Sequence, residues 1–241
     1  MTALLELKQV SKTFGGLRAN WNVSFSVEPR SITGLIGPNG AGKTTLFSCI
    51  TGYYPPSSGE VVFQGQRING RRPDEVCRLG MVRTWQKVRP MAKLTVLDNV
   101  MVGALLRTWS LKRARALAEE QLHAVGLHKQ ASMLAGALPI GQRKRLEVAR
   151  ALATQPALLL LDEVMGGLNP AESNEMIALI LTLRTRGITL VVIEHDVRAI
   201  MAVSDRVLVL NSGELLADGA PREVAENPAV VEAYLGKRVE S

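Results

Sequence analysis

Residues 37–45 read Gly37-Pro38-Asn39-Gly40-Ala41-Gly42-Lys43-Thr44-Thr45 and match the pattern G-x-x-x-x-G-K-[ST]. Glycines let the backbone curl so that successive N–H groups point at phosphate oxygens, and a following helix adds the positive end of its dipole. The run at residues 31–36 predicts a short buried strand before this loop, and residues 44–50 predict the first turns of a helix after it. We therefore expect a bound nucleotide, with Lys43 at its β- and γ-phosphates and the Thr44 hydroxyl on Mg²⁺.

Composition and charge limit the class of protein. The chain has 241 residues, of which 46% are hydrophobic, and this is enough for one large domain with a buried core. No apolar run approaches the roughly 18 residues that cross a bilayer, and the N-terminus has no cleavable signal pattern. We therefore expect a cytosolic chain with reduced cysteines and, at most, peripheral membrane association. The net charge is +7, but no aromatic residues interleave with the basic ones to stack bases, so we expect no nucleic acid partner.

Hydrophobic periodicity changes along the chain. Apolar and polar residues alternate at 22–27, and residues 60–64 follow a turn-forming segment, so this opening region predicts an antiparallel sheet. From about residue 95 to residue 154 the pattern is helical, which indicates an inserted helical subdomain.

The last third of the chain alternates between short apolar runs and helical segments. Continuous apolar runs at residues 158–161, 189–193 and 206–210 are typical of strands that are covered on both faces. Between the first two runs, Asn169 and the three residues after it form a helix start, with proline at the first helical position and glutamate at the third. This alternation predicts a parallel α/β core.

Two acidic residues follow the apolar run at 158–161. A strand of this kind delivers Asp162 and Glu163 to the edge of the sheet where a phosphate loop also lies. Asp162 is expected to hold Mg²⁺, directly or through water, and Glu163 to accept a proton from an attacking water. His195 follows the next strand and is expected at the same edge, although an isolated histidine at such a position is more often a surface residue.

The order of the motifs resembles the ATP-binding subunit of ABC transporters, from about Leu4 to the C-terminus. The motifs are the phosphate loop, Gln86, Leu138-Pro139-Ile140-Gly141-Gln142, residues 158–163, Gly167-Leu168-Asn169-Pro170 and His195. The resemblance implies an α/β fold: a P-loop NTPase core with an antiparallel β subdomain and an inserted helical subdomain. We expect one ABC ATPase domain over residues 1–241, with the nucleotide-binding core and β subdomain at residues 1–90 and 155–241. The helical signature subdomain is expected at residues 91–154.

The same resemblance implies roles for individual residues, with ATP and Mg²⁺ as cofactors. Phe14 matches the aromatic residue that stacks on adenine, and His195 matches the residue that holds the γ-phosphate. Gln86 matches the residue that senses Mg²⁺ and the attacking water, and it links the site to the membrane subunit. Thr44, Gln86 and Asp162 are thus the expected metal residues, and Glu163, His195 and Gln86 the catalytic ones.

The signature motif is expected to act on a second subunit. Pro139, Gly141 and Gln142 lie in this motif, which opens a helix whose N-terminus would face the γ-phosphate on the partner's phosphate loop. Four positions depart from the usual family pattern, namely Pro139 for serine, Ile140 for glycine, Val164 for proline and Asn169 for aspartate. These departures leave Lys43, Asp162, Glu163 and His195 unchanged, so we expect hydrolysis.

Within the family the chain resembles one ATPase of the bacterial branched-chain amino-acid importers, a branch that also serves urea, amides and aromatic acids. The segments that carry this resemblance are Arg83-Thr84-Trp85-Gln86, the signature motif, residues 167–172 and Ala233-Tyr234-Leu235-Gly236. It implies a second, different ATPase subunit, two transmembrane permeases and, indirectly, an external solute-binding protein. The chain would sit at the cytoplasmic face of the bacterial inner membrane, with residues 87–91 and the helical subdomain as the permease dock.

Two other functions share the catalytic residues. An exporter or lipopolysaccharide-transport ATPase has the same motifs, and the contexts of Trp85 and Asn169 argue mildly against it. A soluble ABC ATPase that acts on DNA or ribosomes usually carries coiled-coil insertions, zinc modules or two cassettes in one chain. The sequence has none of these features, so the importer is the favoured hypothesis.

Overall fold

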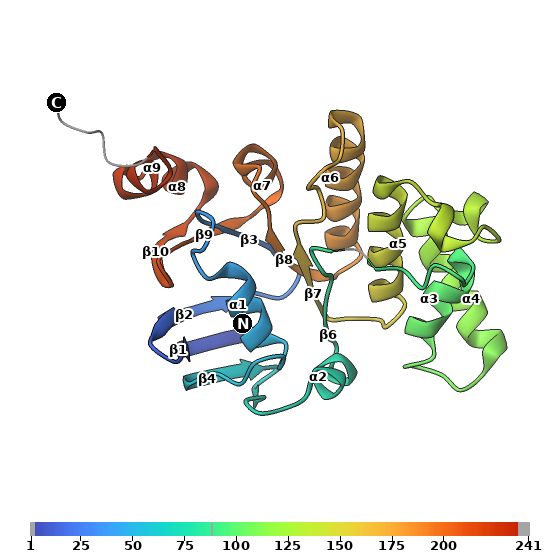
Figure 1. The fold of residues 1–241 in the computed structure, drawn as a ribbon, viewed down its shortest axis with the longest axis horizontal. Helices are drawn as coiled ribbons and strands as arrows, with labels where there is room; N and C mark the ends of the chain where they lie inside the picture. The colour runs from blue at the N-terminus through green and yellow to red at the C-terminus, as the bar shows by residue number, and fades with distance from the viewer. Residues whose placement is uncertain (1–2, 88, 236–241) are drawn as a thin grey trace.

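The computed structural model describes residues 3–87 and 89–235, and a six-stranded sheet runs through its centre (Figure 1). The strand order is β10-β9-β3-β8-β7-β6, and the neighbouring strands are parallel except for β10, which runs antiparallel to β9. The strands are β3 (Ile32–Ile36), β6 (Met81–Arg83), β7 (Leu158–Asp162), β8 (Thr189–Ile193), β9 (Arg206–Asn211) and β10 (Glu214–Gly219). This sheet confirms the predicted parallel α/β core.

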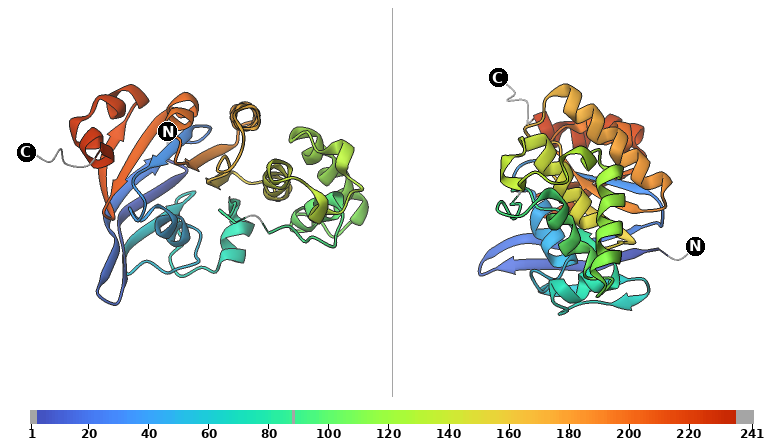
Figure 2. Two further views of the ribbon diagram at one scale, coloured as in Figure 1. Left: turned by 45° about the horizontal axis from the view of Figure 1, so that its top comes forward. Right: turned by 90° about the vertical axis from the view of Figure 1, so that its right-hand side faces the viewer.

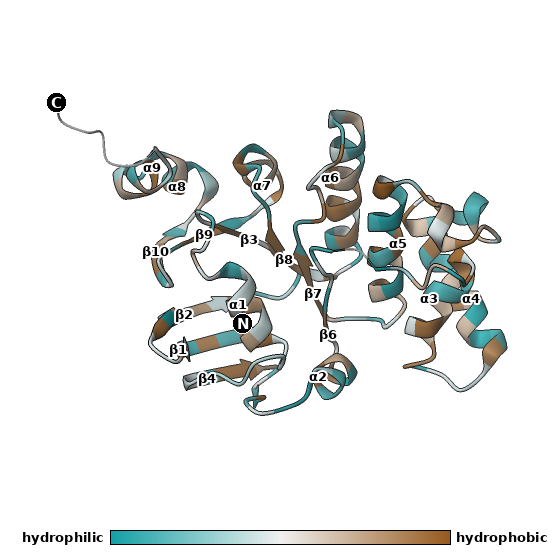
Figure 3. Cartoon of the chain, viewed as in Figure 1, coloured by the Kyte–Doolittle hydropathy of each residue, from teal (hydrophilic) through white to brown (hydrophobic). Residues whose placement is uncertain are grey.

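Helices lie on both sides of this sheet (Figure 1). They are α1 (Lys43–Ile50), α2 (Pro73–Leu79), α3 (Val96–Ala104), α4 (Leu111–Ala124), α5 (Ile140–Leu152), α6 (Pro170–Thr185), α7 (Val197–Val203), α8 (Pro221–Glu226) and α9 (Pro228–Leu235). Successive strand residues face two different cores, because strand side chains alternate between the two faces of a sheet. Leu159 and Leu161 pack with helices α3 to α7, whereas Leu158 and Leu160 pack with α1 and the smaller sheet. The central strands are accordingly the most hydrophobic elements of the fold (Figure 3).

A second, antiparallel sheet has the strand order β2-β1-β4-β5. Its strands are β1 (Leu5–Phe14), β2 (Leu17–Val27), β4 (Ser58–Phe63) and β5 (Gln66–Arg67). The predicted strands at 22–27 and 60–64 are therefore confirmed, except that β4 ends at Phe63. It ends there because Gln64 and Gly65 both have positive φ, at 50° and 74°, and form the two-residue turn into β5.

Helices α3, α4 and α5 form a lobe at one end of the molecule (Figure 2). Short 3₁₀ turns, η1 (His128–Gln130) and η2 (Ala135–Ala137), connect α4 to α5. Gly103 allows α3 to approach α5 closely, since a Cβ at this position would lie 2.3 Å from the carbonyl oxygen of Arg150. The helical pattern predicted from residue 95 to residue 154 is thus confirmed, while the exact division of the chain at residues 91–154 remains our proposal.

Helix α6 begins as the sequence predicts. The Asn169 side chain accepts a hydrogen bond from Glu172 N at 2.9 Å, and the Glu172 carboxylate accepts one from Asn169 N at 3.0 Å. This reciprocal cap fixes the point at which the loop after β7 turns into a helix. Among the described residues, no helix has both the length and the apolar character needed to span a bilayer.

Candidate functional site

The predicted site residues follow strands whose carboxyl ends meet at one edge of the central sheet. Ile193 at the end of β8 is paired on one side with Asp162 of β7 and on the other with Leu35 of β3. The residues that come next along these three strands therefore emerge side by side. They are Glu163, the phosphate loop and the segment that contains His195, so the strand register itself assembles the site.

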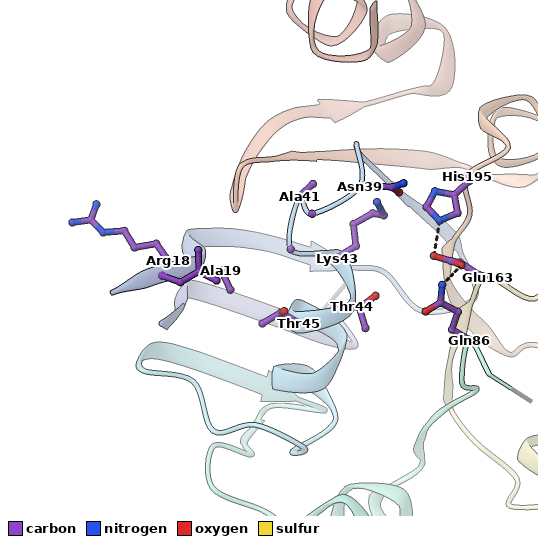
Figure 4. A pocket seen from close by; sticks show the side chains of 13 residues that line it. Arg18, Ala19, Asn39, Ala41, Lys43, Thr44, Thr45, Gln86, Glu163 and His195 are labelled. Carbon is purple, nitrogen blue, oxygen red and sulfur yellow. Dashed lines mark hydrogen bonds and ion pairs between the residues drawn. The ribbon is translucent and has the colours of Figure 1, made fainter. Parts of the chain in front are cut away.

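A cavity of about 480 Å³ opens at this edge (Figure 4). It is lined by residues 39–45 of the phosphate loop, by residues 17–19 of β2, and by Gln86, Glu163 and His195. Figure 4 shows the last three side chains grouped together across the cavity from the phosphate loop. The structure thus brings together most of the residues that the sequence predicts for the nucleotide site.

The Glu163 carboxylate is held from two directions. Gln86 Nε2 donates a hydrogen bond to Oε2 at 2.5 Å, and His195 Nε2 lies 2.6 Å from Oε1. Glu163 also has a φ of 53°, a left-handed conformation that costs a non-glycine residue about 1–3 kcal/mol. A carboxylate held in this way at the wall of a cavity is suited to accept a proton from a water molecule.

The phosphate loop presents an open helix N-terminus to the cavity. Helix α1 starts after Gly42, which has a φ of 98° and provides no side-chain cap, so the first-turn N–H groups are free to bind an anion. A Cβ at Gly42 would lie 2.3 Å from the carbonyl oxygen of Ala19, so this position requires glycine. Lys43 Nζ donates to the carbonyl oxygens of Gly37 and Pro38, at 2.6 and 3.0 Å. Burial lowers the pKa of Lys43, and the nearby acidic pair opposes that shift.

Asp162 lies beside this cavity rather than in its wall. It lines a neighbouring cavity of about 700 Å³ together with Thr44, Thr45 and Gln86. Its Oδ2 accepts a hydrogen bond from Arg83 Nη2 at 2.5 Å, while its buried Oδ1 has no hydrogen-bond partner among the described residues. Burial raises the pKa of Asp162, and the hydrogen bond and charge of Arg83 lower it.

Sequence reasoning missed four buried charged residues around the site. The carboxylate of Glu147 accepts a hydrogen bond from Trp85 N, and that of Glu194 accepts one from Met165 N, each at 2.6 Å. Burial raises the pKa of Glu147, and it raises the pKa of Glu194 to about 7. The others are Arg83 and Lys144. Arg83 and Glu194 directly adjoin apolar strand residues, and this was the available signal for both, because charged residues are rarely buried without a partner. No such signal marks Lys144 and Glu147 in the amphipathic helix α5.

Phe14 and the signature residues lie outside the main cavity. Phe14 packs edge-on against Tyr54, with ring centroids 5.2 Å apart, and Lys12 Nζ lies 4.9 Å from the Phe14 ring centre. Pro139 caps α5 without a side-chain hydrogen bond, and Gly141 and Gln142 follow in the first turn of that helix. None of these residues lines the cavity that contains the phosphate loop. The predicted contacts of Phe14 with adenine and of the signature with a partner's nucleotide stay predictions.

The segment after Gln86 borders the second cavity. Lys87 and Arg89 line it, together with Tyr53 and Trp85, whose ring centroids are 4.8 Å apart. Residue 88 of this predicted dock lies outside the described residues, as does the end of the C-terminal motif from residue 236 onward.

Comparison with known proteins identifies the family. A family model described as "ABC transporter" matches residues 21–166, and one described as "Branched-chain amino acid ATP-binding cassette transporter" matches residues 214–240. The high-affinity branched-chain amino acid transport ATP-binding protein LivG of Escherichia coli (strain K12) is 41% identical over 250 residues. The match covers 97% of this chain and 98% of that protein.

Solved structures agree with this assignment. A nucleotide-free ATP-binding cassette from an ABC transporter matches with a TM-score of 0.89 and 31% identity, over 98% of this chain and 100% of the other. The dimeric post-hydrolysis state of an ATP-binding cassette bound to ADP and Pi matches with a TM-score of 0.82 and 26% identity. This match covers 90% of this chain and 99% of the other. The chain therefore belongs to the ABC transporter family, as an ATP-binding subunit with ATPase activity.

Proposed function

We propose that the chain powers an importer of branched-chain amino acids or related small solutes. The E. coli relative carries branched-chain amino acid transport in its name, and the match at residues 214–240 is to a family described for the same solutes. These similarities favour an importer over an exporter, a lipopolysaccharide-transport ATPase or a soluble ATPase that acts on DNA or ribosomes. The ATPase subunit has no need to contact the solute, so the solute assignment rests on similarity alone.

The observation that carries the catalytic part of the proposal is the single cavity shared by the phosphate loop, Gln86, Glu163 and His195. Backbone N–H groups of the loop bind the phosphates of ATP, and Lys43 moves its ammonium group from the loop carbonyls to the β- and γ-phosphates. Glu163 accepts the proton of the attacking water, and His195 contacts the γ-phosphate. Phe14 stacks on the adenine from the hairpin between β1 and β2.

The residues present fit a magnesium ion beside the phosphates. The Thr44 hydroxyl, the Gln86 amide and the Asp162 carboxylate all border the second cavity, and Asp162 Oδ1 is buried without a hydrogen-bond partner among the described residues. Mg²⁺ prefers such hard oxygen ligands and keeps several waters and phosphate oxygens in its shell, so few protein ligands suffice. When bound, it would neutralise charge on the β- and γ-phosphates.

The signature residues complete the site of a second subunit. Pro139, Gly141 and Gln142 lie at an uncapped helix N-terminus that is separate from the chain's own cavity, and a related cassette forms a dimer with bound ADP and Pi. A helix N-terminus of this kind stabilises an anion, here the γ-phosphate on the partner's loop. We infer that the partner is a different ATPase chain, as in the importer branch that the sequence resembles.

The proposed permease dock is formed by residues 87–91 and the helical subdomain. Lys87 and Arg89 of this dock line the second cavity, beside Tyr53 and Trp85. This cavity lies between the segment that follows Gln86 and the end of α1, and Gln86 is one of its lining residues. A permease segment bound there would therefore contact the glutamine that holds Glu163. Two transmembrane permeases would keep the chain at the cytoplasmic face of the bacterial inner membrane, and an external binding protein would deliver the solute.

A glutamine substitution at Glu163 tests the catalytic assignment. The complex is purified from membranes of the native host through a tag on this chain, and ATP hydrolysis and ATP binding are measured on it. Glu163→Gln should retain ATP binding, lower turnover by at least about 100-fold and accumulate the closed dimer. Glu120→Gln, at an exposed position on α4, is the matched control. Unchanged turnover in Glu163→Gln would remove Glu163 from the role of general base.

Mass spectrometry of the same preparation tests the assembly. Two multi-span permeases and a second ATPase are expected to copurify. The accompanying binding protein can then be titrated with leucine, isoleucine and valine. Copurification of ribosomal proteins or nucleic acid in place of permeases would overturn the transporter assignment and leave the ATPase chemistry intact.

A further inference from the structure

Helix α5 carries the signature residues at its start and two buried charged residues farther along. Lys144 and Glu147 are 5% and 6% exposed. Burying an ionised side chain costs several kcal/mol unless hydrogen bonds or opposite charges compensate for the lost water. Their partners are therefore informative, and both side chains contact loops of the proposed catalytic site.

Lys144 binds the loop that starts at the proposed general base. Its Nζ donates hydrogen bonds to the carbonyl oxygen of Glu163 at 2.8 Å and to that of Gly166 at 2.5 Å. Glu163 also has a left-handed φ of 53°, which is unfavourable for a residue with a side chain. The lysine thus holds both ends of the four-residue turn that aims the Glu163 carboxylate, and it compensates for the strain at this position.

Glu147 lies on the same helix and holds the second loop. Its Oε1 accepts a hydrogen bond from Trp85 N at 2.6 Å, and Trp85 immediately precedes Gln86. The Gln86 amide in turn donates to Glu163 Oε2. The backbone of Glu163 and the amide that binds its carboxylate are therefore both anchored on α5, from positions three residues apart on one helix face.

The start of α5 is fixed to the same region. A Cβ at Gly141 would lie 2.5 Å from Glu172 Oε1, so the signature turn packs directly on the first turn of α6. A shift of α5 along or about its axis would change the hydrogen bonds of Lys144 and Glu147 at the same time. Because the helix N-terminus faces the partner's nucleotide in the proposed dimer, such a shift would follow the binding or release of that nucleotide.

We propose that Lys144 and Glu147 are positioning residues that tie the signature helix to the catalytic carboxylate of the same chain. This proposal rests on the proposed role of Glu163 as general base. Lys144 sets the backbone of Glu163, and Glu147 sets the segment that delivers Gln86. The two ATP sites of a dimer are thereby linked through one rigid helix in each chain, and a displaced Glu163 would leave nucleotide binding intact while it impairs the proton transfer.

Steady-state hydrolysis by the purified complex tests the proposal. Lys144→Met should lower kcat by about 10- to 100-fold, because small misplacements of a catalytic group have effects of this size. KM for ATP should change by less than about two-fold, since Lys144 contacts loops and not the phosphate-binding amides. Lys144→Arg should recover part of kcat, because its guanidinium still donates hydrogen bonds to carbonyl oxygens. Lys129→Met, at an exposed position in η1, is the control.

The outcomes separate this proposal from the proposed function. Full kcat in a folded Lys144→Met variant, or a rise in KM alone, would overturn the positioning role. If Glu163→Gln is inactive in the same assay, the catalytic assignment of Glu163 still stands. If Lys144→Met fails to assemble, Glu147→Leu provides the second test, with the same split between kcat and KM expected. Full kcat in that variant would likewise overturn the proposal.

Discussion

Replacement of Arg83 by methionine removes one half of a fully buried ion pair. Arg83 Nη2 donates to Asp162 Oδ2 at 2.5 Å, and the two side chains are 3% and 0% exposed. Arg83 Nη1 also donates to Ser48 Oγ at 3.0 Å. Methionine fills much of the same volume, but it leaves the Asp162 carboxylate buried without its cation.

The expected loss of stability follows from these contacts. Removal of one partner of a buried ion pair costs about 3–5 kcal/mol, and the lost hydrogen bond to Ser48 adds about 1 kcal/mol. We therefore expect Arg83→Met to lower the free energy of unfolding by about 4–6 kcal/mol at pH 7. Without Arg83 the pKa of Asp162, which burial already raises, rises further, so protonation relieves part of the loss. The deficit should accordingly be smaller at pH 5 than at pH 8.

Equilibrium urea unfolding of the purified chain, followed by circular dichroism, measures this loss. The matched control is Arg115→Met, which removes an exposed ion pair with Glu119, whose side chains are 63% and 50% exposed. That change should cost about 0.5 kcal/mol or less. Arg83→Met combined with Asp162→Asn should be more stable than Arg83→Met alone, because no charge is left unpaired. If the free energy of unfolding of Arg83→Met lies within about 1 kcal/mol of that of the unaltered chain, the buried ion pair does not contribute as inferred.

Two further substitutions test single features of the site. Lys43→Ala should weaken ATP binding at least about ten-fold, because a charged contact to phosphate is lost. Equilibrium dialysis measures this, with Lys129→Ala as the control, and unchanged affinity would contradict the role of Lys43. Burial raises the pKa of Glu194 to about 7, against the opposing effects of Met165 N–H and Lys144 and with support from Glu163. The folded chain therefore binds this proton more tightly than the unfolded chain, so its stability relative to Glu194→Gln should fall as pH rises from about 4.5 to 7, by about 3 kcal/mol at most. If the free energies of unfolding of the two proteins differ by the same amount at every pH in this range, Glu194 does not titrate there.

Local patterns in the sequence were sufficient for the phosphate loop and for part of the secondary structure, but β1, β6, β10 and the short helices α2, α7, α8 and α9 were not predicted. The glycine loop between residues 31–36 and α1 and the apolar runs that became β7, β8 and β9 were predicted from neighbouring residues alone. Such elements can be predicted because their periodicity and their turn residues act over only a few positions. The cap of α6 at Asn169 is of the same kind.

Contacts between distant parts of the chain required the fold. Arg83 and Asp162 are 79 residues apart in sequence, and Gln86 is 77 residues from Glu163, so no local pattern links either pair. Strand register brings them together, and burial then makes the charge of Arg83 necessary. The resemblance to a family supplied the expectation for Gln86 but none for Arg83.

The buried charges on α5 illustrate the same limit. In the sequence, Lys144 and Glu147 are ordinary polar residues of an amphipathic helix, and a solvent-exposed face would suit both. Only packing of α5 against the loops after β6 and β7 places them where water is absent and backbone groups are their partners. Short-range propensity therefore specified the elements and the phosphate loop of this protein. The long-range packing of those elements specified which polar side chains lost water, and so which of them hold the proposed catalytic carboxylate in place.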